Sequence, residues 1–386
     1  MQRELFETEH GDFRDMVRAF CEREIAPRLP GWERAGIVDR GLFTQAGKLG
    51  LLGLNLEEAY GGGGVADFRY NVVLNEELTR VGAAAVTMNL NGFNDLVAPY
   101  LHALCTPEQK TRWLPGLCSG ELVAAIAMTE PGAGSDLRGI RTAAVRDGAG
   151  PDADFVLDGA KTFISNGILA DVVVVAARTG DRDGRATLGL FVVERGMPGF
   201  TRGAKLDKLG LAAQDTAELF FDAVRVPASH VLGDPQAGFT YLTGNLPQER
   251  MSVAVTAVAG MRRSLTEALD HVRTRQAFGG PLTSLQTIRF TLAELATEVE
   301  VAQVFLDRCI AALVAGELTD VDAAMAKWWL TELQQRVVTR CLQLHGGYGY
   351  MREYGVERAY RDARLGPIGG GTDEVMKEIL GKQLGL

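Results

Sequence analysis

Helix-like and strand-like segments are segregated along this chain and do not alternate. Residues 1–122 and 233–386 have the apolar spacing of helices, whereas residues 123–232 contain short β-rich runs separated by turns rich in Gly, Asp and Pro. Because a Rossmann fold needs strands and helices in alternation, this order disfavours one. We predict an α+β chain of three domains: an N-terminal helical domain, a middle β-barrel or sandwich, and a C-terminal four-helix bundle.

Apolar spacing and turn residues locate the elements within each domain. Apolar residues from Phe13 to Ile25 recur at helical intervals, and Pro27 is expected to end that helix. Nearer the C-terminus, Thr319 or Asp320 is expected to cap a helix. The strands are expected at 155–157, 172–175, 188–193 and 219–221, and the later helices at 246–272, 282–315, 321–344 and 373–384.

Charge and cysteine usage narrow the possible partners and the compartment. The net charge is −9 and no long basic run occurs, which argues against nucleic acid as the main partner. No apolar stretch reaches the length of a membrane span, so no integral membrane association is expected. The five cysteines form no Cys-x-x-Cys pair, and the acidic N-terminal residues are unlike a signal peptide. We therefore expect free thiols in a reducing compartment and a cytoplasmic protein.

A segment of small residues, Ala127–Asp136, has the sequence A-M-T-E-P-G-A-G-S-D. Small side chains let the backbone approach a ligand closely, and successive N–H groups can hold a phosphate or a carbonyl oxygen. An ordinary Gly-rich loop is the alternative interpretation, because a single Gly motif is only weakly specific.

Three further segments carry candidate ligand-binding residues. Asp158–Gly167 contains Phe163 and Ser165, which from residue type alone are a core aromatic and a turn hydroxyl. Arg275–Gly279 offers a guanidinium that suits phosphate oxygens, although a single Arg between helices is more often a solvated side chain. Gln343–Tyr350 contains paired glycines that are expected to end a helix.

Glu249 lies in the string L-P-Q-E-R, among apolar residues of a predicted helix. A carboxylate buried there costs free energy, and burial raises the pKa of a glutamate toward neutrality, as a general base requires. A solvated helix glutamate is the alternative interpretation. Pro247 fits the first turn of a helix, so Glu249 is expected near a helix N-terminus, where the helix dipole opposes the shift that burial causes.

Taken in order, these motifs resemble the acyl-CoA dehydrogenase family over nearly the whole chain. The resemblance implies an FAD cofactor and α,β-dehydrogenation of a fatty or branched acyl-CoA to the trans-2-enoyl-CoA, with hydride transfer to flavin N5. It also implies an electron-transfer flavoprotein as acceptor. The family pattern further implies a homotetramer, a dimer of dimers, in which two subunits touch each FAD.

The family pattern assigns cofactor-binding roles to residues from every motif. The expected FAD contacts are Ile126, Met128, Thr129, Gly134, Ser135, Phe163, Ser165, Arg275, Phe278, Gln286, Gln343, Gly346, Gly347, Thr372 and Glu374. Ser135 is also expected beside the pantetheine of the substrate.

The position of the catalytic base distinguishes the branches of the family. Most members carry the glutamate where this chain has Gly370, whereas a minority, similar to the isovaleryl and long-chain dehydrogenases, carry it where this chain has Glu249. We therefore expect Glu249 to be the base, with Arg250 and Gly371 also at the substrate. The N–H of Gly370 is expected to bond the thioester carbonyl.

Other interpretations of the same motifs stay open. Gly369 stands where the long-chain branch usually has a tyrosine, and a glycine there predicts room for branched acyl groups. Pantetheine is common to CoA and carrier proteins, so an acyl- or aminoacyl-carrier-protein dehydrogenase is the main alternative. An acyl-CoA oxidase and a non-catalytic binding protein with the same fold are further alternatives.

Overall fold

A helical layer forms the first third of the chain in the computed structural model, which describes residues 3–150 and 152–386. Thr106 caps the last of these helices through a capping box with Gln109. The helices are α1 (Thr8–Phe20), α2 (Leu29–Ala35), α3 (Gly41–Lys48), α4 (Phe68–Arg80), α5 (Ala84–Asn91), α6 (Ala98–Leu104) and α7 (Pro107–Ser119). Two π-helical segments, η1 (Cys21–Ile25) and η3 (Gly92–Val97), follow α1 and α5.

An eight-stranded sheet follows the helices. Its strands are β1 (Ala124–Ala127), β2 (Ala143–Asp147), β3 (Asp154–Ser165), β4 (Val172–Arg182), β5 (Arg185–Glu194), β6 (Phe200–Lys205), β7 (Thr216–Val226) and β8 (Val231–Leu232). The order is β6-β7-β3-β2-β4-β5-β8, and the short β1 pairs in parallel with β4, so that Ile126 lies opposite Val174. This pairing fixes the start of the Ala127–Asp136 segment to the middle of the sheet.

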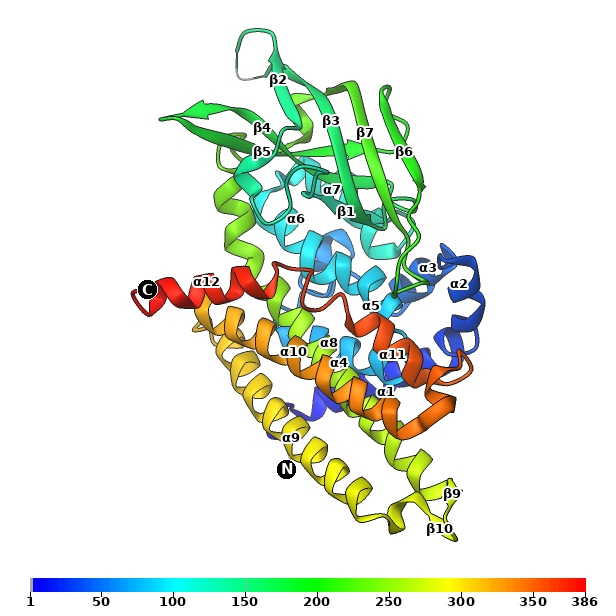
Figure 1. The fold of residues 1–386 in the computed structure, drawn as a ribbon. Helices are drawn as coiled ribbons and strands as arrows, with labels where there is room; N and C mark the ends of the chain where they lie inside the picture. The colour runs from blue at the N-terminus through cyan, green and yellow to red at the C-terminus, as the bar shows by residue number, and fades with distance from the viewer. Residues whose placement is uncertain (1–2, 151) are drawn as a thin grey trace.

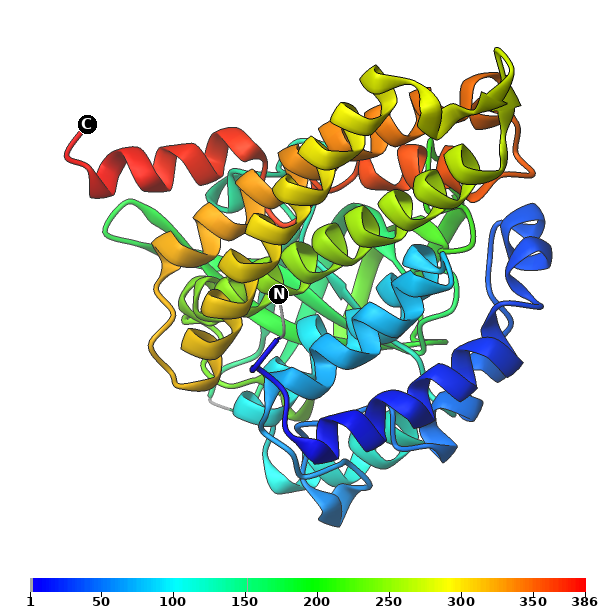
Figure 2. The ribbon, with the colours of Figure 1, turned by 90° about the horizontal axis from the view of Figure 1, so that it is seen from below.

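The remainder of the chain is a bundle of long helices. They are α8 (Gly238–Thr274), α9 (Gln286–Val314), α10 (Asp320–His345), α11 (Gly355–Ala363) and α12 (Asp373–Gln383), and a small hairpin of β9 (Gln276–Ala277) and β10 (Gly280–Pro281) joins α8 to α9. The sheet lies at one end of the molecule and the hairpin at the other (Figure 1). The helices α8, α9 and α10 run side by side, and α4 packs against α8 (Figure 2).

Three apolar cores hold these layers together. Val174 of β4 contributes to a core with the N-terminal helices, whereas its neighbour Val173 contributes to a second core inside the sheet layer. Because successive side chains of a strand point to opposite faces, β4 is covered on both sides. The third core lies between α8, α9 and α10 and includes Val72 of α4, which ties the bundle to the N-terminal helices.

The structure confirms the predicted fold class of helices, then a β layer, then a helical bundle. Thr319 caps α10, as predicted, by accepting a hydrogen bond from the Asp322 backbone. The sequence analysis missed β1, because three of the four residues in Ala124–Ala127 are alanines, which are depleted in strands.

The position expected for Pro247 was wrong. Pro247 does not open a helix; it lies inside α8, which begins nine residues earlier at Gly238. An interior proline removes a hydrogen-bond donor and disfavours a helix locally. Packing of the long helix against α4 and α10 outweighs that local preference here.

The described residues contain no helix that is long and apolar enough to cross a membrane. All five cysteines are free thiols, and four of them are buried.

Candidate active site

Glu249 is the buried acidic residue around which the candidate active site is built. It is 4% exposed and projects from α8 toward Tyr100 of α6. The Tyr100 hydroxyl donates a hydrogen bond of 2.9 Å to Oε1, and the Asn245 amide donates a second one of 3.0 Å to the same atom. Among the described residues no hydrogen bond reaches Oε2 of Glu249, so this oxygen is free to accept a proton.

Burial determines the protonation of Glu249. It raises the pKa of this carboxyl to about 7, against the hydrogen bonds from Tyr100 and Asn245 and the charge of Arg250, which lower it. The helix dipole expected to oppose burial is not significant here, since Glu249 lies eleven residues beyond Gly238 and the dipole acts mainly in the first turn. A carboxylate with such a pKa suits reversible proton transfer near neutral pH.

The Ile368–Thr372 turn faces the same part of α8. A Cβ atom built on Gly370 would lie 3.7 Å from the Val253 side chain, and Val253 is one helical turn after Glu249. Gly370 and Gly371 have φ values of +67° and +94°, which glycine adopts without strain. The turn therefore packs against α8 one helical turn after Glu249, and Gly370 presents no side chain there.

A buried lysine fixes this turn. Lys327 of α10 is fully buried, and its ammonium donates to the Gly371 carbonyl oxygen at 2.6 Å and to the Asp373 carboxylate at 3.1 Å. Burial lowers the pKa of Lys327, whereas Asp373 raises it. Thr372 caps α12 next to this pair, and Glu374 lies exposed in its first turn.

Arg250 is a buried cation beside Glu249. It is 5% exposed, and within the described residues its Nε has no hydrogen-bond partner. Burial lowers the pKa of Arg250, against the charges of Asp320 and Glu249. A buried guanidinium with an unused donor is suited to a polar or anionic ligand group.

The small-residue segment after β1 forms a rigid, exposed loop. The Glu130 carboxylate accepts hydrogen bonds from the backbone N–H groups of Arg141 and Thr142, and from the buried ammonium of Lys161. The same ammonium donates to the Met128 carbonyl at 2.9 Å. Ser135 and Gly134, further along, are exposed. The loop thus exposes small residues, and the hydrogen bonds of Glu130 and Lys161 anchor it to the sheet.

Phe163 lies next to this loop in an unusual conformation. It has φ of +58° within a register irregularity of β3, and its ring is 68% exposed. The neighbouring Thr162 N–H donates to the Thr129 carbonyl at 2.9 Å, which holds the two segments together. A strained and exposed aromatic residue indicates a ring that is available to a planar ligand. It is therefore not the core aromatic that residue type alone suggested.

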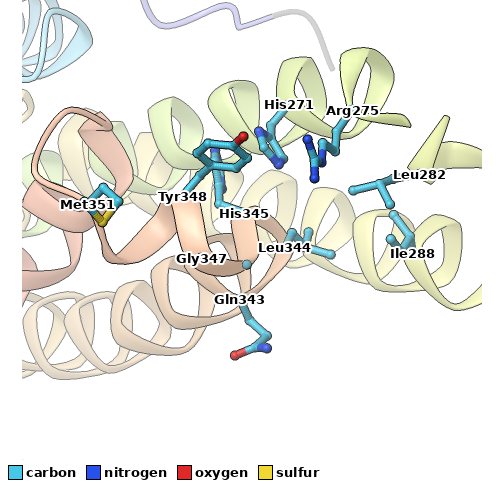
Figure 3. Close-up of a pocket in the computed structure, with 11 residues that line it drawn as sticks. His271, Arg275, Leu282, Ile288, Gln343, Leu344, His345, Gly347, Tyr348 and Met351 are labelled. Atoms are coloured by element: carbon cyan, nitrogen blue, oxygen red, sulfur yellow. The ribbon is translucent and has the colours of Figure 1, made fainter. Parts of the chain in front are cut away.

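A second group of predicted residues surrounds a cavity of about 570 Å³ at the hairpin end of the bundle (Figure 3). Arg275 lies with its guanidinium 5.3 Å from the ring centre of Tyr348, and His271 stacks on His345 with ring centres 4.4 Å apart. The cavity is also lined by Gln343, Gly346 and Gly347. The Gln343 side chain points away from the aromatic group in Figure 3.

Two predicted residues near this cavity lie outside its lining. Phe278, at the tip of the β9–β10 hairpin, is 93% exposed with φ of +52°. Gln286 is the exposed first residue of α9. Within one chain, Phe163 belongs to β3 in the sheet layer, whereas Arg275 follows α8 at the hairpin end of the bundle (Figure 1).

Sequence reasoning missed four residues of the site. Tyr100, Asp95 and Lys327 reach the Glu249 region from distant parts of the chain, and no short motif contains them. Asn245 lies four residues before Glu249 on the same helix, and that spacing is a detectable pattern for contact on one helix face.

Family models for the three parts of acyl-CoA dehydrogenases match this chain. The N-terminal domain model covers residues 7–121, the middle domain model residues 125–224, and the C-terminal domain model residues 236–385. The long-chain specific mitochondrial acyl-CoA dehydrogenase of Rattus norvegicus is 45% identical over 99% of this chain and 88% of its own length. The short-chain specific acyl-CoA dehydrogenase of Megasphaera elsdenii is 35% identical over 97% of both chains.

Solved structures have the same fold. An acyl-CoA dehydrogenase from Geobacillus kaustophilus superposes with a TM-score of 0.94 at 45% identity, over the full length of both chains. An acyl-CoA dehydrogenase from Bacillus anthracis, described as complexed with FAD, gives a TM-score of 0.91 at 28% identity, over 100% of this chain and 68% of its own. A chain described with the electron transferring flavoprotein of Acidaminococcus fermentans gives 0.92 at 32%, over 99% of both.

Proposed function

This chain belongs to the acyl-CoA dehydrogenase family, and on that premise we propose that Glu249 is the base that removes the α-proton of an acyl-CoA thioester. The observation that carries the proposal is a buried carboxyl whose pKa is raised to about 7 and whose Oε2 is free among the described residues. In this position a carboxylate can take a weakly acidic proton and a carboxylic acid can return it.

The residues around Glu249 support a division of tasks between its two oxygens. Tyr100 and Asn245 hold Oε1 and fix the carboxylate plane, so Oε2 is the oxygen that accepts the α-proton. Loss of that proton leaves negative charge on the thioester oxygen. The N–H of Gly370, in the turn that faces Val253, is the donor we assign to this oxygen, and Lys327 holds the turn in place.

The residues present fit an FAD cofactor. Phe163 supplies an exposed ring beside the Met128–Ser135 loop, whose small residues and N–H groups suit a flavin and a pyrophosphate. Arg275 and the glycines Gly346 and Gly347 line a cavity that suits the phosphate and adenosine parts. When bound, FAD supplies the acceptor for the hydride that leaves the β-carbon, so that the trans-2-enoyl thioester forms.

The separation of these two groups supports a shared cofactor site. Because Phe163 belongs to β3 of the sheet layer and Arg275 lies at the hairpin end of the bundle, we infer that a second subunit supplies one of these two groups to each FAD. We propose a homotetramer built as a dimer of dimers, with an electron-transfer flavoprotein as acceptor. A chain of the same fold in the Acidaminococcus structure supports that choice of acceptor. We also propose that the chain has three domains, which comprise residues 1–122, 123–232 and 233–386.

The surroundings of Gly369 support a wide acyl site. The three atoms nearest to a Cβ atom built there all belong to Leu365, at 3.6 Å or more, which is ordinary van der Waals contact. Gly369 is not among the residues with positive φ, so the glycine is not required by the backbone. The space that a larger side chain would fill is therefore left to the substrate, and we propose that branched acyl groups are accepted.

The test is an anaerobic visible spectrum of the purified protein before and after addition of straight and branched acyl-CoAs. Bleaching of oxidised flavin supports the proposal. Bleaching by pantetheine thioesters of an acyl carrier protein, without bleaching by any acyl-CoA, would replace CoA with a carrier protein in the proposed substrate. A protein that takes up FAD but bleaches with neither would contradict the proposal.

A further inference from the structure

A second buried carboxylate, Asp95, lies close to Glu249. It is 1% exposed and belongs to the π-helical segment η3. π-Helical turns are rare and often occur at functional sites, since they change the direction of the side chains that follow. Among the described residues Asp95 pairs with no Lys, Arg or His, so its burial is not offset by an ion pair.

Hydrogen bonds anchor Asp95 to the helices on both sides. The Ser252 hydroxyl on α8 donates to one carboxylate oxygen, and the Asn71 amide on α4 donates to the other. Ser252 is three residues after Glu249, so Asp95 is attached to the same helix as the base. The Asn245 amide, which donates to Glu249, also lies 3.4 Å from the backbone carbonyl oxygen of Asp95.

We propose that Asp95 is a positioning residue that keeps a negative charge beside Glu249 and thereby sets the pH at which Glu249 becomes an active base. Asp95 acts through α8 and Asn245 and needs no contact with the substrate. The proposal rests on the proposed role of Glu249, and it assigns a task to a buried charge that the reaction itself does not use.

The charged and titratable groups that act on Glu249 come from three elements. Tyr100 of α6 and Arg250 of α8 lower the pKa of Glu249, and Asp95 of η3 raises it. Arg250 is in turn influenced by Asp320 of α10 and acts on Lys327 of the same helix. Asp95 therefore adds to burial in raising the pKa of Glu249.

The hydrogen bonds to Asp95 and its burial act in opposite directions on its ionisation. Burial raises the pKa of Asp95 to about 6, against the hydrogen bonds from Ser252 and Asn71, which lower it. A hydrogen-bond donor reaches each carboxylate oxygen of Asp95, and this favours the ionised form of Asp95 beside Glu249. Removing the charge of Asp95 should therefore let Glu249 ionise at lower pH.

The experiment measures the rate of anaerobic flavin bleaching by a saturating acyl-CoA across pH, in the FAD-loaded wild type and in Asp95→Asn. The midpoint of the rate profile is expected to move down by at least about half a pH unit in the variant. An unchanged midpoint in a variant that keeps its FAD would overturn the proposal. If Asp95→Asn fails to fold, Ser252→Ala replaces it.

Ser252→Ala removes a donor that favours ionised Asp95. Asp95 then stays protonated to higher pH, and the midpoint should again move down, by a smaller amount. No shift in this folded variant would also overturn the proposal.

Two further variants separate the loss of the Asp95 charge from other causes of a shifted pH midpoint. Asp362 is another buried carboxyl whose pKa burial raises to about 6, and it accepts a hydrogen bond of 2.6 Å from the Leu211 backbone. Asp362→Asn thus measures how removal of a buried carboxylate elsewhere affects the bleaching rate. The pH midpoint of the rate profile should be unchanged in this variant. Glu249→Gln tests the underlying assignment: if it bleaches at the wild-type rate, the proposed base is wrong, whatever Asp95→Asn does.

Discussion

The Tyr100 hydroxyl lies 2.9 Å from Oε1 of Glu249, although the two residues are 149 positions apart in the sequence. This contact joins the N-terminal helices to the bundle at the candidate base. It also stabilises the ionised form of Glu249, in opposition to burial. The ionisation of Glu249 therefore depends on packing between the two helical parts of the chain.

Tyr100→Phe should move the active pH range upward. The variant removes a hydrogen bond that lowers the pKa of Glu249, so the carboxyl keeps its proton to higher pH. Since a hydrogen bond to a charged group contributes roughly 1.5–3 kcal/mol, the midpoint of flavin bleaching against pH should rise by about one to two units. The shift is opposite in sign to that of Asp95→Asn. Tyr360→Phe, on a half-exposed tyrosine of α11, is the control and should leave the midpoint unchanged.

Gly369→Tyr should narrow the acyl site. The backbone tolerates a side chain there, and the new ring would occupy space next to Leu365. We expect the ratio of kcat/KM for branched over straight acyl-CoAs of equal carbon number to fall by about tenfold. The measurement is steady-state turnover with an artificial electron acceptor. An unchanged ratio in a variant that retains FAD would show that Gly369 does not contact the acyl chain.

Lys327→Met should destabilise the protein. The variant removes the donor to Gly371 and leaves Asp373 without its buried partner, for which a loss of about 3 kcal/mol in the free energy of unfolding is typical. Thermal unfolding followed by circular dichroism measures the loss. Adding Asp373→Asn should restore part of it, because the unpaired charge is then absent. Lys377→Met, on an exposed lysine of α12, is the matched control and should have little effect.

Arg275→Met should weaken the retention of FAD. A guanidinium at the cavity is expected to bond phosphate oxygens, and its loss should weaken affinity by about tenfold. Flavin fluorescence released on dilution measures this without reference to turnover. Arg273→Met changes an exposed arginine two residues earlier on α8 and should release flavin as the wild type does. Equal release from both variants would remove Arg275 from the cofactor site.

The sequence predicted the parts of the fold that depend on local patterns. The long amphipathic helices and the valine-rich strand Val172–Val175 repeat one period over enough residues to be recognised. Pro247 was misplaced because proline usually marks the first turn of a helix, and only tertiary packing shows that α8 continues through it. Local patterns thus identify elements, but the packing of distant elements decides where some of them begin.

The same distinction between local patterns and long-range packing applies to the residues of the candidate site. Glu249 was identified from its motif, whereas its partners Tyr100 and Asp95 come from α6 and η3, about 150 residues earlier. The magnitude and direction of the pKa shift of Glu249 follow from those contacts and from burial. A short motif shows neither the long-range contacts nor the burial of Glu249. The sequence alone therefore did not determine whether burial or the helix dipole has the larger effect on its pKa.

The most direct test of the account compares Glu249→Gln with the wild type in anaerobic stopped-flow bleaching by a saturating acyl-CoA. Glu378→Gln, on an exposed glutamate of α12, serves as the control. If Glu249 is the base, Glu249→Gln should keep its FAD and lose bleaching by at least about a hundredfold at neutral pH, whereas Glu378→Gln should bleach normally. Wild-type bleaching by Glu249→Gln would contradict the central claim and place the base elsewhere.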